Sequence, residues 1–269
     1  MTPPLKLELI SRLPAAADTR PPLLFVHGAY SSAWVWDEFW LPWFAANGWS
    51  AHALSLEGHG DSDGHSWLAA IGIDDYVRNV AQIAATLPAP PVLIGHSMGG
   101  YVIQRYLEQG HPAAGVAMLA SVPPTGMTHA SLAMLWHTPD LLAAVQLFQS
   151  GPDYHPSLSK AKELLFSADM PDERLAQWLG RFQPESMRAV FDMMLVGILS
   201  LPPMHDRLPA LVMGGADDRI IGSTDLLATA THFGVAAEIL PGTGHMLMLD
   251  TRERAAAQRL LEWLHTRFG

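Results

Sequence analysis

Residues 92–101 have the sequence Val-Leu-Ile-Gly-His-Ser-Met-Gly-Gly-Tyr, and they constrain the possible folds of this chain more than any other stretch. An apolar run typical of a strand leads into Gly-His-Ser-Met-Gly, and an amphipathic segment at 101–109 follows at once. This pattern predicts a strand, a very tight turn and a helix. Gly95 and Gly99 lack a Cβ, so strand and helix can approach closely. We therefore expect Ser97 at the apex of the turn, with its hydroxyl pointing into open space.

A helix that begins just after Ser97 directs backbone N–H groups and the positive end of its dipole at the same place. A serine hydroxyl becomes an effective nucleophile when a base removes its proton and hydrogen-bond donors stabilise the resulting oxyanion. Gly-x-Ser-x-Gly also occurs in unrelated proteins, but the strand before it and the helix after it favour the functional interpretation. The turn thus predicts a nucleophile and part of an anion site.

The rest of the chain mostly alternates apolar runs with helical segments. Strands are expected at 5–10 (an edge strand), 23–26, 49–56, 92–94, 115–119, 210–213 and 236–240. Helices are expected at 33–47, 73–87, 101–109, 225–233 and 251–267. Such alternation predicts right-handed βαβ units and an α/β fold with a mostly parallel central sheet flanked by helices. Ligands of such sheets bind outside the carboxyl ends of the strands.

The alternation stops between residues 123 and 205, where no convincing strand is found. Helical stretches are expected there at 131–136, 141–149, 157–166, 171–179 and 184–199. Pro171 and Pro184, each followed by acidic residues, resemble the first turns of helices. We expect a core of residues 1–122 and 206–269, with residues 123–205 inserted after the sixth strand as a helical cap. Its many methionines suit an adaptable apolar pocket wall.

Composition narrows the classes of partner and cofactor. The net charge is −10 and no basic cluster occurs, so a nucleic-acid partner is not expected. The absence of cysteine excludes disulfides and thiolate metal sites. No metal-ligand spacing or dinucleotide fingerprint is present, so neither a metal nor another cofactor is expected. No signal peptide or membrane span is found, which favours a cytoplasmic location. The oligomeric state stays open.

Ser97 needs a base that is itself oriented by an anion, and the last two predicted strands end in loops that carry such residues. The first loop contains Asp217 and Asp218, and the second contains His245. All of them follow strands at the same end of one sheet, so the chain order Ser, Asp, His can give one site. Neighbouring glycines, Gly244 among them, let that loop project its imidazole and distinguish it from the other histidines.

Taken together, these motifs resemble the α/β-hydrolase superfamily over nearly the whole chain. The matching stretches are His27-Gly28-Ala29, Gly-His-Gly-Asp-Ser at 58–62, Gly-His-Ser-Met-Gly at 95–99, Gly-Ala-Asp-Asp-Arg-Ile at 215–220 and Gly244-His245. Within the superfamily, the start of the Gly-His-Gly loop resembles lysophospholipase-like and monoglyceride-lipase-like esterases. Residues 27–36 are also similar to plant-type methylesterases and hydroxynitrile lyases. Ser55 stands where many relatives have Asp.

The resemblance implies that Ser97 is the nucleophile and that His245 acts first as general base and then as general acid. It also implies that Asp218 holds the tautomer of His245. In relatives the acid stands three residues after the glycine, which selects Asp218 over its rival Asp217. A serine at this position argues against dehalogenase or epoxide hydrolase chemistry, which uses Asp there.

The resemblance further implies an oxyanion hole formed by the backbone N–H groups of Ala29 and Met98. His27 and His96 are expected to brace the oxyanion loop and the turn through hydrogen bonds. His59 is expected either to reach the cleft or to cap a turn. The residues that bind the substrate are not assigned.

The function that follows is a serine hydrolase that cleaves a carboxylic ester of a small to medium hydrophobic substrate through an acyl-enzyme on Ser97. The same machinery also serves thioester and carbon–carbon bond hydrolysis. A lyase of the hydroxynitrile-lyase type would use the same triad for proton transfer, and a non-enzymatic ligand receptor would keep fold and triad without turnover. The partner expected in each enzymatic case is a small molecule.

Overall fold

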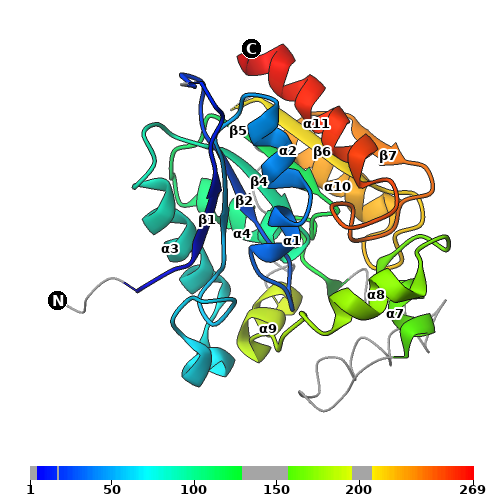
Figure 1. Cartoon of the computed structure of the whole chain (residues 1–269). Helices are drawn as coiled ribbons and strands as arrows, with labels where there is room; N and C mark the ends of the chain where they lie inside the picture. Colours follow the sequence, from blue (N-terminus) through cyan, green and yellow to red (C-terminus); the bar gives the residue numbers. More distant parts are fainter. Residues whose placement is uncertain (1–4, 17, 129–156, 196–207) are drawn as a thin grey trace.

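A computed structural model describes residues 5–16, 18–128, 157–195 and 208–269 of the chain (Figure 1). Its centre is a seven-stranded sheet with the order β1-β3-β2-β4-β5-β6-β7. The strands are β1 (Leu9–Arg12), β2 (Leu23–Val26), β3 (Ala51–Leu54), β4 (Val92–His96), β5 (Gly115–Leu119), β6 (Ala210–Gly215) and β7 (Ala237–Leu240). Only β1 pairs antiparallel in this sheet, against β3, and the other neighbours pair parallel. The predicted α/β class with a mostly parallel sheet is confirmed.

Helices lie on both sides of the sheet (Figure 1). They are α1 (Trp34–Asp37), α2 (Trp40–Ala46), the 3-10 helix η1 (His65–Ala70), α3 (Ile73–Ala84), α4 (Met98–Glu108), α7 (Leu158–Leu165), α8 (Asp172–Leu179), α9 (Met187–Leu195), α10 (Ser223–Phe233) and α11 (Glu253–Phe268). Residues of α1, α2 and α11 pack on one face of the sheet, and residues of α3, α4 and α10 pack on the other.

The position of β2 inside the sheet explains why its sequence is continuously apolar. Leu23 and Phe25 belong to the core on the α1, α2 and α11 side, whereas Leu24 and Val26 belong to the core on the α3 and α4 side. All four side chains are fully buried. A strand covered on both faces has no position for a polar side chain, so the usual alternation disappears.

The turn between β4 and α4 has the predicted strand, turn and helix. Ser97 adopts φ 51° and ψ −117°, and α4 begins at the next residue, Met98. Close packing surrounds the turn, because a Cβ on Gly99 would lie 2.4 Å from the carbonyl oxygens of Val26 and His27. Ser97 is therefore held in a conformation that non-glycine residues rarely adopt.

Two predicted elements differ from the structure near the N-terminus. The helix expected at 33–47 is divided into α1 and α2, and Phe39 between them has a φ of −135°. Pro42 has no N–H and is tolerated only in the first turn of a helix, so a new helix begins just before it. The strand expected at 5–10 begins later, at Leu9, because the backbone of Lys6 bonds with Asp63 instead.

Between β5 and β6 the described residues form α7, α8 and α9, which lie below the sheet in Figure 1. The helices predicted at 131–136 and 141–149 lie outside the described residues, as does the end of the one predicted at 184–199. In the described part of the chain, five strands precede this segment. The predicted insertion after the sixth strand was therefore wrong, because the segment follows the fifth, β5.

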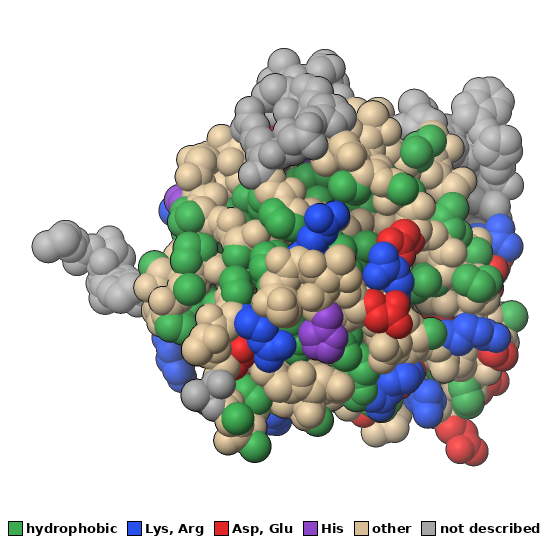
Figure 2. All heavy atoms as spheres, turned by 90° about the horizontal axis from the view of Figure 1, so that it is seen from above, with side chains coloured by type: hydrophobic (Ala, Val, Ile, Leu, Met, Phe, Trp, Pro, Cys, Tyr) green, Lys and Arg blue, Asp and Glu red, His purple; other side chains and the backbone are tan. Residues whose placement is uncertain are grey.

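Acidic and basic side chains lie interspersed on the face of the molecule that Figure 2 shows, with hydrophobic and uncharged groups between them. None of the helices that the structure describes combines the length and the apolar character needed to cross a membrane.

We expect Gly99→Ala to destabilise the protein, because the new Cβ would meet backbone oxygens that cannot move freely. Overpacking of this kind costs about 1–3 kcal/mol. Urea unfolding measures the loss. The matched control is Gly180→Ala, where a Cβ meets nothing within 4 Å, and its effect should stay within about 0.5 kcal/mol. Equal stabilities of the two variants would contradict the close packing described for Gly99.

Candidate active site

His245 and Asp218 form a buried hydrogen-bonded pair. His245 Nδ1 lies 2.8 Å from Asp218 Oδ2, and the two side chains are 4% and 1% exposed. The second oxygen of Asp218 accepts the N–H groups of Ile220 and Ile221 at 2.8 and 2.9 Å. Because a carboxylate can only accept, the proton of the neutral imidazole sits on Nδ1. The other nitrogen, Nε2, is then available as a base.

The rival acid, Asp217, is placed differently. Asp217 is exposed, and its backbone N–H donates to the carbonyl oxygen of Thr243 at 2.9 Å. Of the two neighbouring acids, Asp218 is the one that the structure brings to His245.

The loop that carries His245 is tied to the end of β4. His96 Nε2 donates to the carbonyl oxygen of His245 at 3.0 Å, and the two rings are 4.7 Å apart. The pKa of His96 lies well below its ordinary value, mainly because the ring is buried and secondly because His245 is close. The ring is therefore neutral. Ser97 follows directly after His96. Among the described residues we find no hydrogen bond from Ser97 Oγ to His245, so that contact stays a prediction.

The loop after β2 lies against the same turn. A Cβ on Gly28 would lie 2.7 Å from His96 Nδ1 and 3.1 Å from Ser97 Cβ. Ala29 follows Gly28, and Met98 is the first residue of α4. In the part of the chain that the structure describes, the N–H groups of Ala29 and Met98 donate to no protein acceptor. Two free donors close to a serine are what an oxyanion site requires.

His27 braces this loop. Its Nε2 accepts the N–H of Leu56 at 3.0 Å, and its Nδ1 donates to the carbonyl oxygen of Gly28 at 2.8 Å. Burial is the main reason that the pKa of His27 falls to about 3, so the ring is neutral with its proton on Nδ1. His27 therefore joins the loop after β2 to the loop after β3, in agreement with the predicted bracing role.

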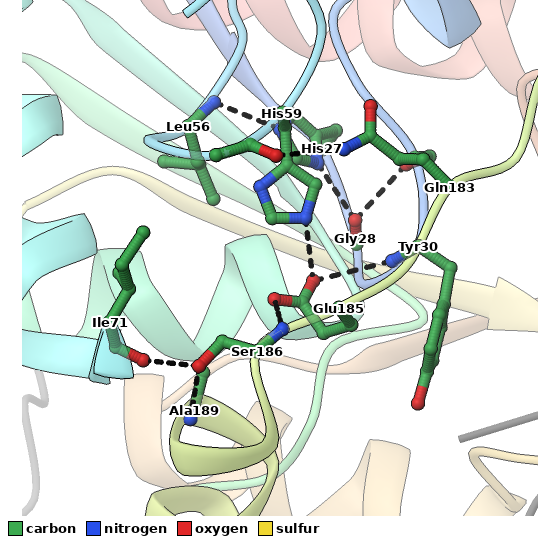
Figure 3. Close-up of polar contacts among 12 residues, drawn as sticks. His27, Gly28, Tyr30, Leu56, His59, Ile71, Gln183, Glu185, Ser186 and Ala189 are labelled. Atoms are coloured by element: carbon green, nitrogen blue, oxygen red, sulfur yellow. Dashed lines mark hydrogen bonds and ion pairs between the residues drawn. The ribbon is translucent and has the colours of Figure 1, made fainter. Parts of the chain in front are cut away.

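His59 is fully buried and lies between two acceptors (Figure 3). Its Nδ1 is 3.1 Å from the carbonyl oxygen of Glu57, and its Nε2 is 3.0 Å from Glu185 Oε2. Both nitrogens must donate if Glu185 is ionised, which makes His59 an imidazolium. Burial by itself lowers the pKa of His59, but the Glu185 carboxylate and these hydrogen bonds raise it above the ordinary value. Sequence left open whether His59 faces the cleft or caps a turn, and the structure shows a buried ion pair.

Glu185 accepts hydrogen bonds on both carboxylate oxygens. Oε2 faces His59 and, at 3.3 Å, the N–H of Tyr30. Oε1 accepts the hydroxyl of Tyr76 and the N–H of Ser186, both at 2.6 Å. Burial by itself raises the pKa of Glu185, but His59 and the other donors outweigh it and lower the pKa, so the group is ionised. A carboxylate with so many donors tolerates full burial.

This role of Glu185 was missed by sequence analysis, which placed the residue in the first turn of a helix. That interpretation was wrong, because α9 begins two residues later, at Met187. A proline followed by an acidic residue gives the same local pattern whether the acid lies in the first turn of a helix or is buried before the helix begins. Its partners Tyr30, His59 and Tyr76 lie far away in the chain, so no local signal could have identified them.

A second buried carboxylate, Asp250, was also not identified by sequence analysis. Asp250 Oδ2 accepts the N–H of Gly244 at 2.7 Å and the N–H of Ser167 at 2.9 Å. Gly244 precedes His245, and Ser167 follows α7. Asp250 therefore connects the histidine loop to the segment between β5 and β6. Within residues 5–16, 18–128, 157–195 and 208–269, no group of three His, Asp or Glu residues could hold a metal ion.

Comparison with known proteins agrees with the observed fold. Residues 23–258 match the profile described as "Alpha/beta hydrolase family". The chain is 28% identical over 211 residues to "Pyrethroid hydrolase" from Sphingobium wenxiniae, which covers 74% of this chain and 71% of that protein. A soluble variant of monoglyceride lipase from Saccharomyces cerevisiae has a similar structure, with a TM-score of 0.76 at 17% identity over 98% of this chain and 93% of that one. A thermophilic esterase from Thermogutta terrifontis has a TM-score of 0.72 at 18% identity, over 98% and 95%. The two structures, at this identity, show the shared fold.

The buried pair of His59 and Glu185 predicts a pH window of stability. The raised pKa of His59 means that its contribution is complete below its ordinary value of 6.5 and is lost as the pH rises through the raised pKa. The lowered pKa of Glu185 means that its contribution is complete above its ordinary value of 4.5 and is lost as the pH falls through the lowered pKa. The stabilisation by the pair is therefore largest between pH 4.5 and pH 6.5, the two ordinary pKa values.

We expect the free energy of unfolding of wild type to exceed that of the double variant His59→Gln/Glu185→Gln most strongly inside this window. The excess should shrink on both sides, because one partner loses its charge there. Urea unfolding inside the window, and about two pH units above and below it, measures the difference. A difference that does not change with pH would show that the pair is not ionised in the folded protein.

Proposed function

The chain belongs to the alpha/beta hydrolase family, and we propose that it is a serine hydrolase that cleaves carboxylic esters. The observation that carries this proposal is the buried hydrogen bond between His245 and Asp218, in a loop that His96 ties to the Ser97 turn. A serine, an imidazole and a carboxylate in this order form the constellation that activates a hydroxyl for attack on an acyl carbon.

The proposed mechanism assigns one step to each group. His245 Nε2 takes the proton of Ser97 as the hydroxyl attacks the acyl carbon, and Asp218 stabilises the imidazolium that forms. The N–H groups of Ala29 and Met98 donate hydrogen bonds to the oxyanion of the tetrahedral intermediate. His245 then protonates the departing alcohol and activates a water molecule, which releases the acid from Ser97.

Three relatives support an ester as the substrate class. They are named as a pyrethroid hydrolase, a monoglyceride lipase and an esterase. We propose that residues 123–205 form a helical cap over the site, and that the substrate is small to medium in size and hydrophobic. The described part of this segment reaches the loop after β2, since the N–H of Gln183 donates to the carbonyl oxygen of Tyr30 at 2.9 Å.

Ser97→Ala removes the nucleophile without adding volume, so we expect a folded protein without ester turnover. Wild type should release p-nitrophenol from a short-chain p-nitrophenyl ester in a burst followed by a steady state, because the acyl-enzyme accumulates. Stopped-flow absorbance measures both phases, and circular dichroism checks the fold. Turnover retained in the variant would remove Ser97 from the mechanism.

Asp218→Asn should lower kcat by on the order of 10⁴-fold, because an amide no longer holds the reactive tautomer of His245. The control is Asp217→Asn, which changes the exposed neighbour in the same loop and should leave kcat within about twofold of wild type, as surface substitutions usually do. Steady-state kinetics on the same ester compare the two. The reverse order of effects would assign the acid to Asp217.

A further inference from the structure

Tyr30 has a backbone conformation that requires support. Its φ is 65°, in the left-handed region that non-glycine residues rarely occupy. The residue follows Ala29 directly, so contacts that fix Tyr30 also restrict the movement of Ala29 and its N–H. Residues held in such conformations cost on the order of 1–3 kcal/mol and persist only where their surroundings fix them.

Both backbone polar groups of Tyr30 are held by one segment, residues 182–186 between α8 and α9. The N–H of Tyr30 donates to Glu185 Oε2 at 3.3 Å. The carbonyl oxygen of Tyr30 accepts the N–H of Gln183 at 2.9 Å. The loop after β2 is therefore paired with a segment more than 150 residues later in the chain.

Further bonds fix this segment to the core. The side chain of Gln183 accepts the N–H of Gly60 and donates to the carbonyl oxygen of Gly58, both at 2.9 Å. The hydroxyl of Ser186 donates to the carbonyl oxygen of Ile71 at 2.5 Å. Glu185 thus reaches Tyr30 from a backbone that cannot shift easily.

The charge of Glu185 also bears on the reaction. A lone carboxylate next to the oxyanion loop would oppose the negative charge that develops there, in a buried region where such interactions are strong. His59 Nε2 lies 3.0 Å from the carboxylate and both side chains are fully buried, so the imidazolium offsets that charge. The pair can therefore hold the loop with little net charge.

We propose that Glu185 is a positioning residue that holds Tyr30, and through it the N–H of Ala29, in the geometry that receives the oxyanion. The proposal rests on the proposed esterase function. Glu185 does not touch the substrate, and its effect reaches the reaction through the loop. Loss of the carboxylate should therefore weaken the binding of the transition state more than the binding of the substrate in its ground state.

Glu185→Met tests this role, because methionine keeps the length of the side chain and has no strong acceptor. We expect kcat on a p-nitrophenyl ester to fall on the order of 10- to 100-fold, less than the 10²- to 10³-fold of a donor removed outright. KM should stay within about threefold, because the loss is confined to the transition state. The inhibition constant of a trifluoromethyl ketone, which forms a tetrahedral oxyanion on the serine, should rise by the same factor as kcat/KM falls.

The matched control is Asp192→Leu in α9, which likewise removes the acceptor. Asp192 Oδ2 also accepts a backbone N–H of the core, that of Ile73 at 3.0 Å, and among the described residues no hydrogen bond joins Asp192 to Tyr30. A general loosening of this segment would affect both variants alike. We expect kcat and the inhibition constant of Asp192→Leu to stay within about twofold of wild type, as for a substitution away from the site.

Unchanged kcat and inhibitor affinity in Glu185→Met, or equal losses in both variants, would overturn the proposal. If Glu185→Met does not fold, Glu185→Asp tests the proposal instead. Its shorter side chain withdraws the carboxylate from Tyr30 and should lower kcat. An unchanged kcat would overturn the proposal. Ester turnover that depends on Ser97 but not on Glu185 refutes only the positioning role. Absence of Ser97-dependent turnover in wild type refutes the proposed function and the positioning role together.

Discussion

The close packing of α4 against the end of β2 is the constraint on which the rest of the site depends. Gly99 lies so near the carbonyl oxygens of this strand and of His27 that no side chain fits there. Because the backbone turns so sharply, Ser97 takes a positive φ and α4 can begin at the next residue. The first N–H groups of a helix have no partner within it, so Met98 has a free donor beside the serine. The other parts of the proposed site are arranged around this turn.

Buried polar bonds connect the loops around the turn. His96 fixes the backbone of His245, and His27 joins the loop after β2 to the loop after β3. Burial keeps the rings of His27 and His96 neutral, so each can donate from one nitrogen without the cost of a buried charge. These histidines are close in the sequence to the proposed site residues Ala29 and Ser97, but their hydrogen bonds show a structural role.

Two buried carboxylates join the segment between β5 and β6 to opposite sides of the site. Glu185 belongs to that segment and bonds to the loop that contains Ala29, whereas Asp250 follows β7 and bonds to Ser167 and to the loop of His245. A buried charge is tolerated when hydrogen bonds engage its oxygens, and removal of a partner is costly. The segment is therefore held in a defined position relative to both the proposed oxyanion donors and the proposed base.

The sequence by itself determined the α/β class, the two-sided burial of β2 and the turn at Ser97, because each is encoded in a few neighbouring residues: an apolar run, a glycine on either side of a serine, a helical periodicity. The tertiary structure alone decided that His59 is a buried cation and that Glu185, which local pattern assigns to a helix start, is its counter-ion. Three partners of Glu185 (Tyr76, His59 and Tyr30) are separated from it by 109 to 155 residues. Such hydrogen bonds exist only once folding has brought distant segments together, so no local pattern encodes them.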